Sequence, residues 1–188
     1  TGYTDGVTKS SEQLVISTTT APVRRGYLKF LLSAIPPGVT IVSSVLKITN
    51  NGTVGSSGSA NQVRGLALNE PVGTSAATLF TAASTGTLYN NNTWSNIGQV
   101  SLTLLAAANT DISNSITAPG YIGIGLVRGA GANVYNFYGY GDAVNSPVLT
   151  VTYASIRSFA VTMNPATPAT PGTISGPVSV CPGTTGNF

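Results

Sequence analysis

The segment Tyr27-Leu28-Lys29-Phe30, followed by Leu32, decides the fold class. In an extended chain Leu28, Phe30 and Leu32 share one face, and Tyr27 and Lys29 share the other. Alternation with a period of two is typical of a β-strand that has one side against a core. The segment therefore predicts a strand in a sheet.

The same alternation recurs along the chain. Further strands are predicted at 41–49, 100–104, 122–126 and 149–153, with weaker ones at 14–17, 62–68 and 134–140. Only Ala76–Ala83 has a pattern that suits a short helical turn. The chain therefore reads as a succession of short strands.

Turn signals separate these strands. Ile35-Pro36-Pro37-Gly38 predicts a turn, because proline fixes φ and glycine allows a positive one. Asn50-Asn51-Gly52 is a hairpin signal, and Gly129-Ala130-Gly131-Ala132 is a weaker one. Many short strands with turns between them predict an all-β fold, and specifically a jelly-roll β-sandwich over residues 1–154.

The composition suits an extracellular β-protein. The chain has 188 residues, of which only 7% are charged, against about a quarter in a typical soluble domain. Threonine and serine are abundant, as on the solvent-facing sides of strands. The content of β-branched and apolar residues does not suit disorder.

Most catalytic chemistry lacks its residues here. Histidine is absent and Cys181 is the only cysteine, which excludes a histidine triad, a histidine-ligated zinc site and a disulfide within the chain. The acids are scattered without a paired motif: Asp5, Glu12, Glu70, Asp111 and Asp142. We expect no enzymatic activity.

The charge pattern also limits the partners. The excess of positive charge is only +3, and only Arg24 and Arg25 are adjacent. A surface that follows a phosphate backbone needs clustered cations, so we expect no nucleic acid. No apolar run approaches the length that crosses a bilayer, so we expect no membrane insertion.

The sequence changes character after the predicted sandwich. Residues 155–171 form an extension and a linker, which ends in the proline-rich stretch Pro165–Pro171. Residues 172–188 suit the first strand and turn of a second, Ig-like β domain that stops early. So short a piece cannot fold alone, so the sequence predicts a longer parent chain.

A family resemblance is carried by Arg25–Phe30, Ile35-Pro36, Gly38, Leu46–Ile48 and the closing stretch Pro147–Tyr153. These residues resemble DNRLRE-type modules, which are jelly-roll, carbohydrate-binding-like domains of secreted bacterial proteins. The resemblance covers about residues 1–153. Leu31 departs from the pattern, because the family usually carries aspartate there.

The tail 172–186 resembles a second family, the immunoglobulin-like or PKD-like repeats of very large Bacteroidetes surface proteins. This resemblance implies export by type IX secretion and a role in adhesion or gliding. It also implies that Cys181 pairs with a cysteine beyond Phe188. The expected location is secreted, at the cell surface, with neighbouring Ig-like domains of the same polypeptide as partners.

The candidate ligand site is aromatic. Trp94 lies in the polar stretch 89–96, which predicts an exposed ring. Tyr138 and Tyr140 share a strand face with Asn136, so a platform for stacking on sugars would combine Trp94 with these tyrosines, with Arg128 or Asn136 as polar contacts. The alternative is that these rings belong to ordinary core packing.

Structural calcium is the second site hypothesis. It would use Asp5 near Glu12, or Asp142 beside Asn145, with backbone carbonyls. No other cofactor is expected.

The sequence predicts a non-catalytic structural or adhesive module: a spacer, adhesin or filament domain of a long secreted surface protein. The alternative is a carbohydrate-binding module that anchors the parent protein to a polysaccharide. Self-association of the modules is a further expected interaction.

Overall fold

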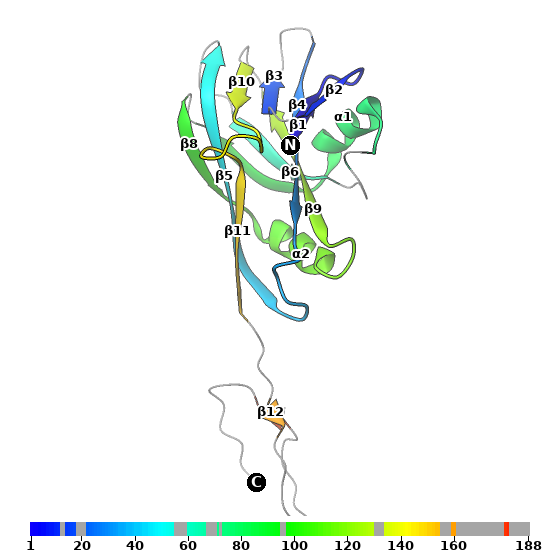
Figure 1. Cartoon of the computed structure of the whole chain (residues 1–188), viewed down its shortest axis with the longest axis vertical. Helices are drawn as coiled ribbons and strands as arrows, with labels where there is room; N and C mark the ends of the chain where they lie inside the picture. Colours follow the sequence, from blue (N-terminus) through cyan, green and yellow to red (C-terminus); the bar gives the residue numbers. More distant parts are fainter. Residues whose placement is uncertain are drawn as a thin grey trace, which may run out of the picture.

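The computed structural model shows an all-β sandwich of two antiparallel sheets, which confirms the predicted fold class (Figure 1). The residues that it describes are 1–11, 14–17, 22–54, 60–66, 71, 73–94, 97–129, 134–154, 159–160 and 179–180.

The first sheet has six strands in the order β2-β1-β4-β9-β6-β7. Their bounds are β1 Gly2–Thr4, β2 Lys9–Ser11, β4 Arg25–Leu31, β6 Ala60–Gly65, β7 Leu88–Thr93 and β9 Tyr121–Arg128. The predicted alternation holds on β4, where Leu28 is fully buried and pairs with the equally buried Ile124 of β9. Both side chains belong to the core between the two sheets.

The second sheet is built around one long strand. Its strands are β3 Leu14–Ser17, β5 Thr40–Val54, β8 Gly98–Thr103, β10 Val134–Phe137 and β11 Val148–Ala154. β8 pairs with 45–50 of β5, while β11 pairs with 40–47 and β10 with 50–54. Residues 45–47 of β5 pair with both β8 and β11, and Asn50 pairs with both β8 and β10. β10 and β11 therefore share one edge of β5, and β8 lies along the other edge.

Two predicted hairpins are wrong. Asn50-Asn51-Gly52 lies inside β5, where Phe137 pairs with Asn50 and Asn136 with Gly52. Asn51 is therefore the extra residue of a β-bulge, which the same amide and glycine residues tolerate. Residues 130–132 of the second predicted hairpin lie outside the described residues, but the strands on either side, β9 and β10, belong to different sheets and do not pair with each other.

Helix α1, Ala76–Thr85, covers the outer face of the first sheet and confirms the helical turn expected at 76–83. Ser75 caps it, since its side chain accepts a hydrogen bond from the Thr78 amide. Leu79 and Ala83 are buried in a small cluster with Tyr27 and Leu66. Arg25 fastens the helix: its Nη1 donates to the Phe80 carbonyl at 2.6 Å, and its guanidinium lies 3.7 Å from the centre of the Phe80 ring.

Helix α2, Ala106–Ser115, was not predicted. Its residues are mostly small and polar, with low helix propensity, so few apolar side chains mark its period. The signal is the spacing of four between Leu104, Ala108 and Ile112, all of which are buried in the core. The helix closes one end of the sandwich between β5 and β9 (Figure 1).

The helices of the described part of the chain are too short and too polar to span a bilayer. Past Ala154 the description covers only β12, Phe159–Ala160, paired with β13, Ser179–Val180. The rest of the predicted linker at 155–171 and of the predicted second domain at 172–188 lies outside the described residues.

Candidate functional site

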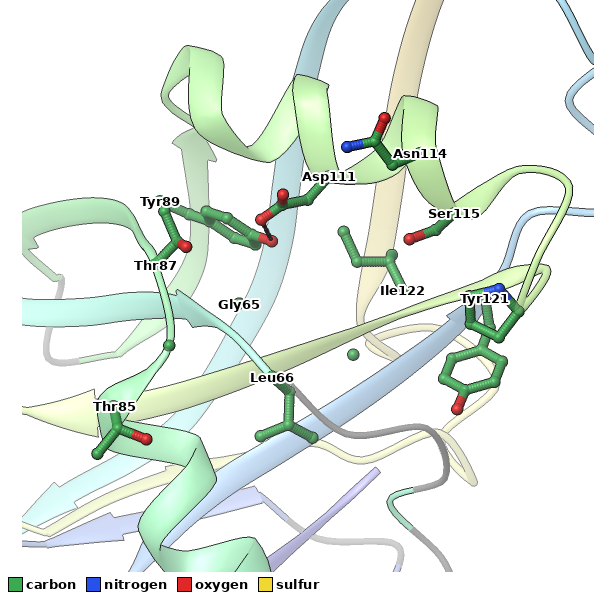
Figure 2. A pocket seen from close by; sticks show the side chains of 13 residues that line it. Gly65, Leu66, Thr85, Thr87, Tyr89, Asp111, Asn114, Ser115, Tyr121 and Ile122 are labelled. Carbon is green, nitrogen blue, oxygen red and sulfur yellow. Dashed lines mark hydrogen bonds between the residues drawn. The ribbon is translucent and has the colours of Figure 1, made fainter.

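A pocket of about 640 Å³ opens where the two helices meet the end of the first sheet (Figure 2). The residues that line it come from β6, the end of α1, β7, α2 and β9: Gly65, Leu66, Thr85, Gly86, Thr87, Tyr89, Asp111, Asn114, Ser115, Pro119, Tyr121, Ile122 and Gly123. Its volume lies within the range of about 300–1,000 Å³ that is usual for small-molecule sites. This pocket was not predicted from the sequence.

One wall of the pocket is the polar face of α2. Asp111, Asn114 and Ser115 are spaced by three and four residues, so a helix presents them on one side. Figure 2 shows the Asp111 carboxylate pointing down from this helix toward Tyr89, with Leu66 and Ile122 below it, while the Asn114 amide points upward beside the helix. The spacing was visible in the sequence, but it has meaning only once this segment is known to be helical.

Tyr89 and Asp111 form the strongest polar contact of the pocket. The Tyr89 hydroxyl donates to Asp111 Oδ2 at 2.6 Å. Burial raises the pKa of Tyr89 far above its usual range, and the hydrogen bond and the negative charge of Asp111 raise it further. Tyr89 is therefore a neutral donor that orients the carboxylate.

Gly65 leaves the space that the Tyr89 hydroxyl occupies in this contact. A β-carbon at Gly65 would lie 2.5 Å from the Tyr89 hydroxyl oxygen, so any larger residue would displace the phenol from Asp111. The Tyr89 ring itself is only 1% exposed and is part of the core.

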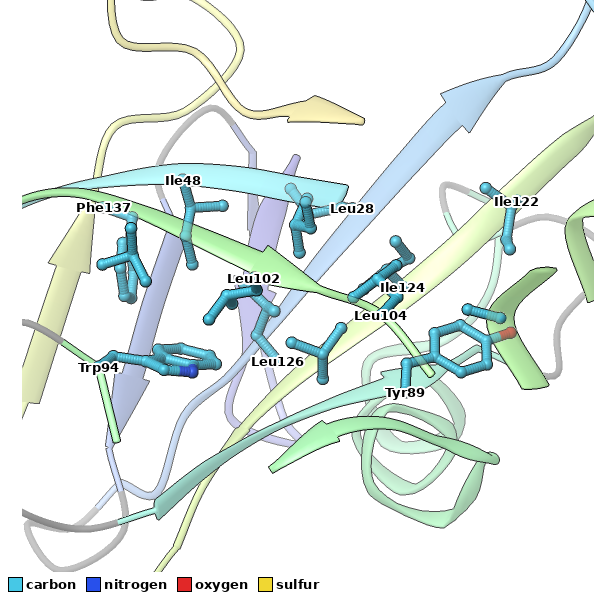
Figure 3. Packing of buried hydrophobic residues seen from close by; sticks show 14 of the residues in the cluster. Leu28, Ile48, Tyr89, Trp94, Leu102, Leu104, Ile122, Ile124, Leu126 and Phe137 are labelled. Carbon is cyan, nitrogen blue, oxygen red and sulfur yellow. The ribbon is translucent and has the colours of Figure 1, made fainter. Parts of the chain in front are cut away.

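The tryptophan of the predicted aromatic platform is not on the surface. Trp94 is 2% exposed, so the expectation of an exposed ring is wrong. It follows the last residue of β7 and turns inward, meeting Tyr135 and Phe137 edge to face at centroid distances of 6.4 and 5.7 Å. Figure 3 shows the indole at the end of the core opposite Tyr89. The polar residues next to Trp94 in the sequence indicated an exposed ring. Its burial was not predicted, because its aromatic partners Tyr135 and Phe137 come from a strand that is distant in sequence.

The other predicted site residues are divided between the core and the surface. Arg128 is 4% exposed, with its guanidinium 5.5 Å from the centre of the Tyr135 ring, and burial lowers its pKa. Asn136 and Tyr138 are half-buried, and Tyr140 is 72% exposed. Trp94 and Arg128 are thus brought together around Tyr135, while Tyr140 is on the surface.

Several buried polar atoms near Trp94 make no hydrogen bond. They are the Trp94 Nε1, the Tyr135 hydroxyl and both amide atoms of Asn61. Asn61 is fully buried on β6 and pairs across the sheet with Arg128. A buried polar atom without a partner costs about 1–3 kcal/mol, so this end of the core is less stable than its apolar remainder.

The carboxylates proposed for calcium bind their own loops. Asp5 Oδ1 accepts from the amides of Val7 at 2.9 Å and Thr8 at 2.7 Å, and Asp142 Oδ1 accepts from those of Val144 at 3.0 Å and Asn145 at 2.7 Å. These bonds lower the pKa of both carboxyls. Glu12 lies outside the described residues, and within them no group of three or more metal-ligating side chains comes together.

A scan of the sequence against protein-family models finds no match, and a search among curated proteins finds none either. The resemblances to DNRLRE-type and Ig-like domains therefore stay predictions.

Proposed function

We propose that this chain is a non-catalytic module with a structural or adhesive role in a long bacterial protein that is secreted to the cell surface. The observation that carries the proposal is how the described carboxylates are used. Asp5 and Asp142 each hold an exposed turn, and Asp111 is bonded to Tyr89. Glycoside hydrolysis needs two carboxyl groups flanking one bond, about 5–10 Å apart, and the described residues that line the pocket supply one.

The strand that leaves the sandwich supports a mechanical role. β11 pairs with β5 from Val148 to Ala154 and runs along it to the end of the sandwich (Figure 1). Tension applied beyond Ala154 along this direction stretches the β11–β5 hydrogen bonds side by side rather than one after another. Such an arrangement resists separation until several bonds break together.

A bead-retention experiment tests the proposal. Beads coated with the complete chain are held under flow on surfaces coated with polysaccharides or with the chain itself, and released reducing sugar is measured in parallel. We expect retention on at least one surface, compared with albumin-coated beads, and no sugar release. Release of sugar would show an enzyme, and absence of retention on every surface would contradict the adhesive role.

Carbohydrate binding is the second candidate function. The predicted stacking platform does not support it, because Trp94 is buried. The pocket beside Asp111 does, since it combines a carboxylate, an amide and hydroxyls on a partly apolar floor.

A further inference from the structure

The electrostatics of the pocket select against an anionic ligand. Among the described residues that line it, Asp111 is the only one with a charged side chain. The C-terminal ends of α1, at Thr85, and of α2, at Ser115, both face it, and helix C-termini carry partial negative charge. A phosphate, sulfate or carboxylate would therefore meet repulsion, whereas a group that donates hydrogen bonds would be attracted.

Two cations lie beside the pocket without lining it. Arg64 lies at the end of α1, where its Nη1 donates to the Gly86 carbonyl at 2.8 Å and its Nε to Gln62 Oε1 at 2.8 Å. The Lys29 ammonium lies 4.3 Å from the centre of the Tyr121 ring. Neither residue lines the pocket.

The pocket is also poorly suited to an organic cation. Sites for quaternary ammonium groups surround the charge with open aromatic faces. Here the Tyr89 ring is buried in the core, and the Tyr121 ring, 8% exposed, is already in contact with Lys29. The aromatic residues of the pocket therefore offer no cage for a cation.

The polar groups of the pocket are suited to hydrogen bonds with alcohol hydroxyls. The hydrogen bond to Tyr89 uses Asp111 Oδ2. The other oxygen, Asp111 Oδ1, makes no hydrogen bond to the described residues. This oxygen can accept a hydrogen bond from a hydroxyl group, and charge-assisted bonds of this kind are stronger than neutral ones. Asn114 and Ser115 each donate and accept, as the hydroxyls of a sugar do.

We propose that this pocket binds a neutral sugar unit of a polysaccharide, with Asp111 as the main acceptor and Asn114 as its neighbour on α2. The inference rests on the proposed adhesive function and names the ligand class of the module. Leu66 and Ile122 form the apolar floor, and Tyr89 holds the carboxylate in place. The bond to Tyr89 fixes the acceptor before the ligand arrives, which reduces the cost of ordering it.

The test is a titration of the complete 15N-labelled chain with neutral oligosaccharides built from glucose, xylose, mannose or galactose, at millimolar concentration. Glycine amides report the place of binding. We expect those of Gly65, Gly86 and Gly123, which line the pocket, to shift with at least one of the sugars. Those of Gly38 and Gly141, which have open space around them, should not shift.

Two variants and a matched control locate the interaction. Asp111→Asn keeps an acceptor for Tyr89 but removes the charge, and we expect affinity to fall about tenfold or more. Asn114→Ala should also weaken binding. Ser113→Ala, at an adjacent exposed position of α2 outside this pocket, should leave it unchanged. Circular dichroism checks that each variant is folded.

The outcomes separate this inference from the proposed function. Binding that shifts other glycines, or that is unchanged in Asp111→Asn and Asn114→Ala, would overturn the pocket but leave adhesion intact. Binding only of glucosamine or galacturonic acid oligosaccharides would overturn the neutral class. If no oligosaccharide binds while coated beads are still retained, the sugar site is wrong and the adhesive role stands; if retention is also absent, both fail.

Discussion

The hydroxyl of Tyr89 and the carboxylate of Asp111 are joined by a hydrogen bond of 2.6 Å. It connects an edge strand of the first sheet, β7, to the helix that closes the end of the sandwich. The backbone makes the same connection, because the Leu105 amide donates to the Tyr89 carbonyl at 2.7 Å just before α2 begins. The position of the pocket carboxylate is thus tied to the core.

The raised pKa of Tyr89 predicts a loss of stability in alkali. The folded protein holds this proton more tightly than the unfolded chain does. The contribution of Tyr89 is fully present below the unfolded tyrosine pKa of about 10, and it is lost as the pH rises above that value. Urea denaturation near neutral pH and near pH 11 should show this fall in the free energy of unfolding.

The variant Tyr89→Phe isolates the effect. At neutral pH it should be less stable by about 1–2 kcal/mol, because it leaves Asp111 without its donor. Above pH 10 its stability should fall less steeply than that of the natural chain. Burial also raises the pKa of Tyr27, so a residual slope is expected in both proteins. Equal slopes would contradict the prediction.

Replacement of Trp94 should destabilise the sandwich rather than remove a surface contact. Trp94→Ala is expected to cost about 3–5 kcal/mol, because it leaves a cavity beside Tyr135 and Phe137. As the only tryptophan, it should emit at short wavelength and resist quenching by acrylamide. The control is Tyr140→Ala at a 72% exposed position, expected to change stability by no more than about 0.5 kcal/mol. Red-shifted emission would contradict the burial.

Asn61→Leu should stabilise the protein. Both amide atoms of Asn61 are buried without a hydrogen bond, and leucine has a similar volume. We expect the free energy of unfolding to rise by about 1–2 kcal/mol. Asn92→Leu, at the exposed position that pairs with Asn61 on β7, should have little effect. A decrease for Asn61→Leu would mean that the amide has a bound partner such as water.

Gly125→Ala should loosen α1 from the sheet. A methyl group at Gly125 would overlap the carbonyl oxygen and the Cα of Ala83, which are backbone atoms of the helix. We expect a loss of about 1–3 kcal/mol. Gly141→Ala, where no atom lies within 4 Å, serves as the control. Thermal unfolding of the two variants measures the difference, and similar melting temperatures would contradict this packing.

Much of the strand pattern could be predicted because it is local. Alternation at Leu28, Phe30 and Leu32 predicts which side of the strand faces the core, and no distant residue is needed. The helix at 76–85 was partly predicted from the pattern of Ala76–Ala83, and its cap at Ser75 was found only in the structure. The hairpin at Asn50–Gly52 was not, since amide and glycine residues serve a bulge as well as a turn.

The candidate site depends on tertiary structure. Tyr89 and Asp111 are separated by 22 positions, and neither carries a motif that points to the other. The helix that holds Asp111 is weakly marked, and its spacing becomes clear only when Ala108 and Ile112 pack against the sheets. The exposed position expected for Trp94 was wrong for the same reason, because polar neighbours in sequence say little about which strands fold over a ring.

By itself, the sequence determined an all-β chain, the faces of its main strands and the scarcity of catalytic groups, because each follows from composition or from contacts between near neighbours. The tertiary structure decided that the tryptophan is buried and that a pocket lies at the opposite end of the core. Both depend on segments far apart in the chain, whose meeting is governed by the packing of the whole sandwich rather than by any local preference.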